Sequence, residues 1–142
     1  MTTSSGTKGL MNAKDADVIL SGSFVNAGAI INYLKSRKTE NISLVCMGYE
    51  GHTPTQEDTF LAEYIKAMMM DQPADFGRMK EILRTGDGSR LLDPANNEWS
   101  PASDFDLCLD LNRFDFVLKL EKEEYFKFGK LPVLKVVKKS AF

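Results

Sequence analysis

The segment from Gly48 to Asp58 has the highest density of side chains that could take part in chemistry. It contains Glu50, His52, Glu57 and Asp58 within eleven positions. Two adjacent carboxylates at the start of a helix could hold a hard divalent cation such as Mg²⁺, with waters completing the shell. Such an ion would neutralise the charge of a phosphate and polarise its ester bond. The spacing therefore makes Glu57 and Asp58 candidate metal ligands.

The same residues also fit a purely structural role. The pattern Thr55-x-x-Asp58 is similar to a capping box, and the helix dipole alone favours acidic residues in a first turn. His52 is the only histidine, so a zinc site with several histidines is excluded. It could act as an acid or base near neutral pH, although an exposed loop histidine is the commoner case. Spacing alone leaves both interpretations open.

Two further loops are candidates for binding an anion. Residues 2–7 are small hydroxyl side chains with Gly6, and a following helix at about 7–13 would present N–H groups to phosphate or sulfonate oxygens. Residues 21–26 open the next helix, where Ser23 suits an N-cap and Asn26 could direct its amide toward a ligand. Simple capping turns, or a disordered N-terminus, would explain both loops without a ligand.

These loops lie between segments whose apolar patterns predict alternating strands and helices, and those elements must position them. Residues 41–48 are apolar on both faces, as in a central parallel strand, and Trp99 is expected to anchor a turn-rich loop at 85–101. The order favours an α/β fold, layered α/β/α with a mainly parallel sheet and mixed strands toward the C-terminus. Ligands of such sheets bind at the carboxyl ends of the strands. The predicted elements are strands at 17–21, 41–48, 105–120 and 131–137, and helices beginning at Ser23 and covering 55–70 and 76–83.

Composition bounds the class of protein. The 142 residues fit a single α/β domain over 1–142, and 43% hydrophobic with 27% charged residues excludes disorder of the whole chain. A net charge of −2 gives no strong attraction to nucleic acid or membranes. Cys46 and Cys108 lie in apolar runs, so we expect buried, reduced thiols in a cytoplasmic protein. The chain has no apolar export segment and no run near the ~20 apolar residues that cross a bilayer.

Four motifs follow one another in a fixed order along the chain: TTSSGT at 2–7, SGSFVNA at 21–27, VCMG at 45–48 and EDT at 57–59. Taken together, they resemble the 2-phosphosulfolactate phosphatase family. The aspartate- and phenylalanine-rich run at 106–118 also matches the family's ending, and the resemblance covers nearly the whole chain. Longer members have an N-terminal half with an aspartate-arginine motif and an Asn-Ser-Pro loop, so we expect this chain to correspond only to the C-terminal portion.

The resemblance implies an activity and a set of site residues. Family members are Mg²⁺-dependent acid phosphatases that cleave phosphosulfolactate to sulfolactate and phosphate, a step toward coenzyme M. Glu57 and Asp58 would hold the metal or activate water. The implied substrate-binding residues are Thr3, Ser5, Gly6, Thr7, Ser23 and Asn26.

A second hypothesis belongs to another class. The chain would be a non-catalytic half-domain or fragment that associates with itself or with a partner chain. A sheet without its first strand exposes an edge, and exposed edges favour pairing. We therefore expect a homo-oligomer. Under the first hypothesis the chain also binds a small phosphorylated substrate, and under neither hypothesis do we expect nucleic acid or membrane as a partner.

Overall fold

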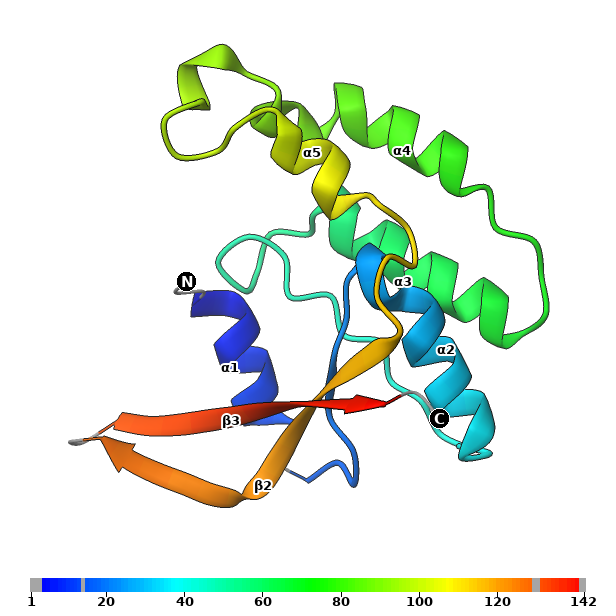
Figure 1. Cartoon of the computed structure of the whole chain (residues 1–142), viewed down its shortest axis with the longest axis vertical. Helices are drawn as coiled ribbons and strands as arrows, with labels where there is room; N and C mark the ends of the chain where they lie inside the picture. Colours follow the sequence, from blue (N-terminus) through cyan, green and yellow to red (C-terminus); the bar gives the residue numbers. More distant parts are fainter. Residues whose placement is uncertain (1–3, 14, 129–130, 141–142) are drawn as a thin grey trace.

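The computed structural model describes residues 4–13, 15–128 and 131–140. In Figure 1, α3, α4 and α5 lie in the upper part of the view, and the β2–β3 hairpin crosses the lower part beside α1. The elements in chain order are α1 (Ser4–Asn12), β1 (Leu20–Ser21), η1 (Phe24–Asn26), α2 (Ala27–Ser36), α3 (Gln56–Met69), α4 (Phe76–Thr85), η2 (Asp87–Leu91), η3 (Pro94–Asn96), α5 (Ser103–Cys108), β2 (Phe116–Phe128) and β3 (Leu131–Ser140).

The sheet has three strands in the order β1-β2-β3, and both pairings are antiparallel. Leu20 lies opposite Lys119, and Val117 lies opposite Lys139. A register shift interrupts the β2–β3 ladder between Glu121 and Phe126. The prediction of mixed helix and sheet is confirmed, but a layered arrangement with a mainly parallel sheet is not formed among the described residues.

Two local differences explain this outcome. Residues 41–48 belong to no helix or strand, and their backbone makes no hydrogen bond to the backbone of another described residue. The predicted strand at 105–120 divides instead into α5 and the first part of β2. Asp104 and Asp106 occupy the first turn of α5, where the helix dipole favours them. Apolar density alone does not distinguish a strand from a short buried helix.

The core lies between α2, α3, α4 and the start of β2. On α2, the side chains of Ala27, Ile30 and Ile31 are all buried and repeat with the helical period. Rings at the start of α2 and on α3 and α4 meet edge-on or tilted, with centroids 5.2 to 6.4 Å apart. The largest side chains with almost no exposure are Leu83, Phe105 and Val117.

Two expectations about single side chains were wrong. Trp99 is 67% exposed, because the segment after η3 follows the surface instead of folding back on the core. Cys46 and Cys108 are free and exposed. Partial burial still raises the pKa of both thiols, and nearby carboxylates, including Asp58 for Cys46, raise it further. Both cysteines are therefore protonated, weak nucleophiles at neutral pH.

An ion pair between α4 and α5 gives a pH-dependent prediction. Lys80 Nζ lies 2.9 Å from Asp106 Oδ1, and this hydrogen bond and charge lower the pKa of the carboxyl. Because the pKa of Asp106 is lowered in the folded state, the stabilisation by this ion pair is present above the ordinary carboxyl pKa. It is lost as the pH falls through the lowered pKa of Asp106. We expect the difference in Tm between the native chain and Asp106→Asn to be small and positive at pH 7 and to vanish at strongly acidic pH. A difference that grows on acidification would contradict this assignment.

Among the described residues, no helix is both long and apolar enough to span a membrane.

Candidate active site

The N-terminus of α3 is held by the loop that follows α4. Thr55 is extended at the N-cap position but its side chain makes no capping bond, so the predicted Thr55–Asp58 capping box is not formed. Asp87 takes over this role: its Oδ2 accepts from the Gln56 N–H at 2.7 Å, and its own N–H donates to Gln56 Oε1 at 2.9 Å. The first turn of α3 is therefore fixed from outside the helix, which leaves its two carboxylates for other contacts.

Asp58 joins α3 to the end of the extended segment. Its Oδ2 accepts a 2.7 Å hydrogen bond from the Gly48 N–H, and its backbone oxygen accepts from the Cys46 thiol at 3.4 Å. Gly48 has a φ of +61°, and a Cβ there would overlap the backbone carbonyl of Thr53. Glycine is required at this turn because it alone satisfies both conditions.

Glu57 is only half satisfied. Its Oε1 pairs with Arg90 Nη2 at 2.6 Å, while Oε2 is buried without a hydrogen-bond partner. A buried carboxylate oxygen without a hydrogen-bond partner is costly and rare in folded proteins. Glu57 is therefore the residue of this turn whose environment is incomplete.

Arg90 was missed by sequence reasoning. It lies in η2, within the segment predicted only as a turn-rich loop, and reaches Glu57 across 33 positions of sequence. Asn96 Nδ2 donates to the Arg90 backbone oxygen at 2.8 Å, which holds the loop in place. A single arginine in a polar loop carries no pattern that would have indicated this contact.

The carboxylates fit a Mg²⁺ site completed by substrate, but not a cage made by protein alone. Within the described ranges, no group of three or more His, Cys, Asp or Glu side chains converges. Mg²⁺ is often held by one or two carboxylates, with phosphate oxygens and waters filling the remaining positions. Each carboxylate offers oxygens of this kind separately, Glu57 through its unpartnered Oε2 beside Arg90 and Asp58 beside the Gly48 N–H, since consecutive residues of a helix do not face each other.

The second loop packs against α3 close to these carboxylates. A Cβ on Gly22 would lie 3.8 Å from Leu61, one helical turn beyond Glu57. Ser23 is exposed, whereas Asn26 is buried and its Oδ1 accepts from the Ser23 N–H at 2.9 Å. The capping interpretation of this pair is therefore confirmed, and it places the Ser23 hydroxyl on the surface.

The first loop is part of a helix. Helix α1 begins at Ser4, so Ser5, Gly6 and Thr7 lie in its first turns; Thr3 lies outside the described residues. Gly9 fits directly against the Met47 side chain, where a Cβ would overlap the sulfur. This close contact sets α1 beside the end of the segment that leads to Gly48.

His52 stands apart from the carboxylates. It lies on the exposed tip of the turn closed by the bridge between Tyr49 and Thr53. Its backbone N–H donates to the Tyr49 oxygen at 3.3 Å. The interpretation of His52 as an exposed loop residue is therefore the one that fits.

Comparison with known proteins decides the family. The family model described as 2-phosphosulpholactate phosphatase matches residues 1–123, a range that includes the motifs in the loops described above. The chain belongs to this family. The narrower expectation, that this 2-phosphosulfolactate phosphatase family member corresponds only to the C-terminal portion of the family, was wrong.

The curated relatives are similar over part of their length. A probable 2-phosphosulfolactate phosphatase of Synechocystis is 32% identical over 76 residues, 54% of this chain and 31% of that protein. One from Synechococcus sp. (strain RCC307) is 30% identical over 98 residues, 69% of this chain and 34% of the relative. The chain thus spans about a third of the length of these relatives. No solved structure matches it significantly.

Proposed function

We propose that this chain takes part in the hydrolysis of 2-phosphosulfolactate, or a similar small phosphoester, to sulfolactate and phosphate. The observation that carries the proposal is the half-satisfied Glu57 beside Asp58 at the start of α3, in a chain of the 2-phosphosulpholactate phosphatase family. A buried polar atom without a partner is rare in folded proteins, and an ion or a ligand is one of the groups that can satisfy it.

Mg²⁺ is the proposed cofactor, held by Glu57 and Asp58. When bound, it would neutralise phosphate charge and polarise the ester. The bond from Gly48 to Asp58 fixes the orientation of that carboxylate. A carboxylate in this turn would accept a proton from the attacking water. Ser5, Gly6 and Thr7 at the start of α1, with Ser23 and Asn26, are the proposed substrate-binding residues, since helix N-termini favour anions.

Arg90 is the proposed cation for the acidic groups of the substrate. Its guanidinium already lies 2.6 Å from Glu57, and its planar fork suits phosphate, sulfonate or carboxylate oxygens. We expect Arg90→Ala to raise KM about tenfold or more, the usual effect of losing a charge-assisted hydrogen bond. The free energy of unfolding should change by only about 0.5–1 kcal/mol, because the ion pair is partly exposed.

The matched control for Arg90 is Arg113→Ala. Arg113 forms a comparable half-exposed pair with Asp110 at 2.8 Å, in the turn before β2. Steady-state kinetics of both variants separate the two roles that Arg90 could have. A fall in kcat with an unchanged KM would show that Arg90 only orients Glu57 and does not bind substrate.

Metal removal tests the proposed function. The purified chain should release inorganic phosphate from 2-phosphosulfolactate in the presence of Mg²⁺, lose this activity in EDTA and regain it when Mg²⁺ is restored. Unrelated phosphoesters lacking a sulfonate serve as substrate controls. Release that is insensitive to EDTA would rule out the metal. No release under any of these conditions would contradict the proposal for the chain by itself.

The sheet arrangement, the cell compartment and the pathway are proposals that concern the full-length family fold. We propose that a mainly parallel layered sheet is formed in full-length relatives, and that the chain acts in the cytoplasm in a step toward coenzyme M.

Association without catalysis is the second candidate function. One observation favours it: the backbone of segment 41–47 has no backbone partner among the described residues.

A further inference from the structure

The turn that carries Arg90 is joined to α3 by two reciprocal hydrogen bonds between Gln56 and Asp87. Asp87 Oδ2 accepts from the Gln56 N–H at 2.7 Å, and the Asp87 N–H donates to Gln56 Oε1 at 2.9 Å. Gln56 is the first residue of α3, so its N–H has no acceptor within the helix. The Gln56–Asp87 pair therefore fixes the start of α3 and the start of η2 to each other.

The ion pair of the candidate site is formed by the residues next to the Gln56–Asp87 pair. Glu57 follows Gln56 directly, and its Oε1 lies 2.6 Å from Arg90 Nη2. Asp87 and Arg90 are three residues apart in η2, and residues at this spacing in a 3₁₀-helix lie on the same side, one turn from each other. The two contacts together hold one side of η2 against the first turn of α3.

Contacts with α4, α5 and η3 also restrict η2. A Cβ on Gly88 would lie 2.7 Å from the Leu83 backbone oxygen and 2.9 Å from the Phe105 ring, so this part of η2 packs closely on both helices. Asn96 Nδ2 donates to the Arg90 backbone oxygen at 2.8 Å. The backbone of Arg90 is therefore held in place, although its side chain is half exposed.

A guanidinium that is already oriented binds an anion at a lower cost. The arginine side chain has many rotamers, and ordering it on binding loses conformational entropy. Its planar fork must also match the oxygens of a phosphate, sulfonate or carboxylate. Asp87 would supply this orientation through the backbone of η2, while its own carboxylate is engaged by the Gln56 N–H.

We propose that Asp87 is a positioning residue of the candidate site, which holds Arg90 against Glu57 in the orientation that binds the acidic groups of a small phosphoester. The inference rests on the proposed function, because that function assigns Arg90 to substrate binding. Loss of the Asp87 carboxylate frees the start of η2, and the effect reaches the substrate through Arg90.

Steady-state kinetics of Asp87→Ala test this role. We expect KM for 2-phosphosulfolactate to rise about 3- to 10-fold, the effect of ordering one long side chain on binding, with kcat nearly unchanged. In an Arg90→Ala background the same substitution should add nothing to KM, because residues that act through one another are not additive. Asp87→Asn should restore most of the native KM, since its amide oxygen can accept the Gln56 N–H.

Asp75→Ala is the matched control. Asp75 is another exposed aspartate whose side chain accepts a first-turn N–H, that of Arg78 at 2.9 Å at the start of α4. Asp75→Ala should lower the Tm by a similar amount to Asp87→Ala and leave KM at its native value. An equal rise of KM in both variants would reduce Asp87 to a helix cap and overturn the positioning role.

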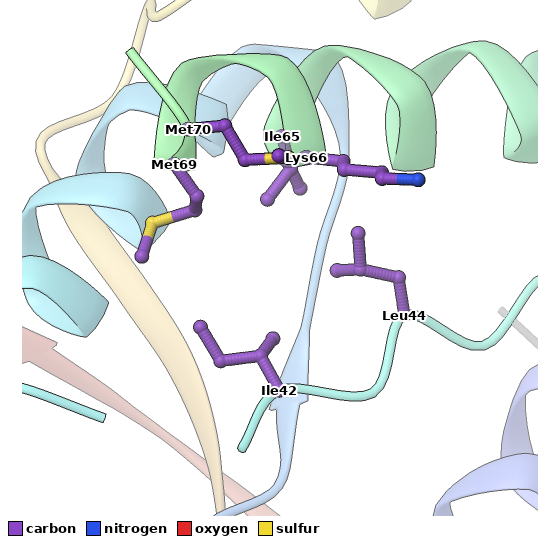
Figure 2. Close-up of a pocket in the computed structure, with 6 residues that line it drawn as sticks. All are labelled: Ile42, Leu44, Ile65, Lys66, Met69 and Met70. Atoms are coloured by element: carbon purple, nitrogen blue, oxygen red, sulfur yellow. The ribbon is translucent and has the colours of Figure 1, made fainter. Parts of the chain in front are cut away.

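A groove toward the other end of α3 provides a second control. It is lined by apolar side chains and by Lys66, and Figure 2 shows the Lys66 amine directed away from Ile42 and Met69. Lys66 lies roughly 13 Å along the helix from Glu57. Lys66→Ala should leave KM unchanged. A rise of KM in Lys66→Ala but not in Asp87→Ala would place the substrate at the groove and overturn the positioning role.

The NMR signal of the Arg90 side chain separates this inference from the phosphatase proposal. The ¹H–¹⁵N signal of Arg90 Nε should shift in Asp87→Ala and stay unchanged in Asp75→Ala. This result, with no phosphate release by the native chain, would refute the proposed function and keep Asp87 as the residue that holds Arg90. Phosphate release with an unchanged KM and an unchanged Arg90 signal in Asp87→Ala would overturn the positioning role alone.

Gln56→Ala keeps the test decisive if Asp87→Ala fails to fold. It removes the Oε1 acceptor of the Asp87 N–H but leaves the Gln56 N–H, and alanine is favourable in a helix. We expect a rise of KM and a shift of the Arg90 signal in the same direction as for Asp87→Ala. Native values of both would contradict the role of the Gln56–Asp87 pair.

Discussion

Asp58→Asn is expected to lower phosphate release from 2-phosphosulfolactate about 100-fold or more, the range of a lost acid/base or metal-binding carboxylate. The amide is isosteric with the carboxylate, and its oxygen can still accept the Gly48 N–H bond that Asp58 accepts at 2.7 Å. The loop and the start of α3 therefore keep their arrangement. Replacing an ionised acceptor by a neutral one should cost only about 1 kcal/mol of stability.

The control for Asp58→Asn is the carboxylate at the other end of the same helix. Asp71 follows the C-terminus of α3 and pairs with Lys35 at 2.5 Å on an exposed surface. Asp71→Asn should keep full phosphate release and nearly the native Tm. Equal activity of both variants would remove Asp58 from the site, and equal loss in both would indicate a general effect on the fold.

Gly48→Ala is expected to reduce both stability and activity. The φ of +61° strains any residue with a Cβ, and the added carbon would overlap the carbonyl of Thr53, which is backbone and cannot turn away. We expect the free energy of unfolding to fall by about 2 kcal/mol or more. Relief of the overlap must move the Gly48 N–H away from Asp58, so phosphate release should fall as well.

Gly51→Ala distinguishes the effect of a positive φ from the effect of the overlap with the Thr53 carbonyl. Gly51 has a φ of +82° in the same turn, but a Cβ there would meet nothing within 4 Å. The variant should lose only about 1–2 kcal/mol, the cost of a left-handed residue, and should keep its activity. Urea unfolding of both variants measures the difference. Equal losses of stability and activity would show that the contact with Thr53 has no role.

The helices were predictable because their packing follows local patterns. The apolar spacing of α2 and α3 repeats with the helical period. The helix expected at 55–70 is found as α3 at Gln56–Met69, whereas the helix expected to begin at Ser23 opens with η1 and continues as α2 from Ala27. Pairing of strands depends on distant segments, so the apolar pattern at 41–48 indicated a buried strand, although the backbone of this segment pairs with no other described residue. The run at 105–120 was ambiguous, because short apolar stretches suit α5 as well as a strand.

The candidate site shows the same limit. The adjacent carboxylates Glu57 and Asp58 were evident from their position at a predicted helix start. Their partners were not: Gly48 lies ten residues before Asp58, and Arg90 lies 33 residues after Glu57. Nothing local requires these contacts, since tertiary packing against α3 creates them, of η2 in the case of Arg90 and of the segment ending at Gly48 in the case of Asp58. The expected capping box was displaced for the same reason, because Asp87 caps α3 from that loop.

The most direct test of the site is to observe where the substrate binds. Backbone amide NMR signals of the chain are followed while 2-phosphosulfolactate is added in the presence of Mg²⁺. The signals of Gly48, Glu57 and Asp58 should shift together, whereas those of Asp110 and Arg113, in the turn before β2, should stay unchanged. Shifts confined to other parts of the chain, or unchanged signals at α3 with saturating substrate and Mg²⁺, would contradict a phosphate site at this helix.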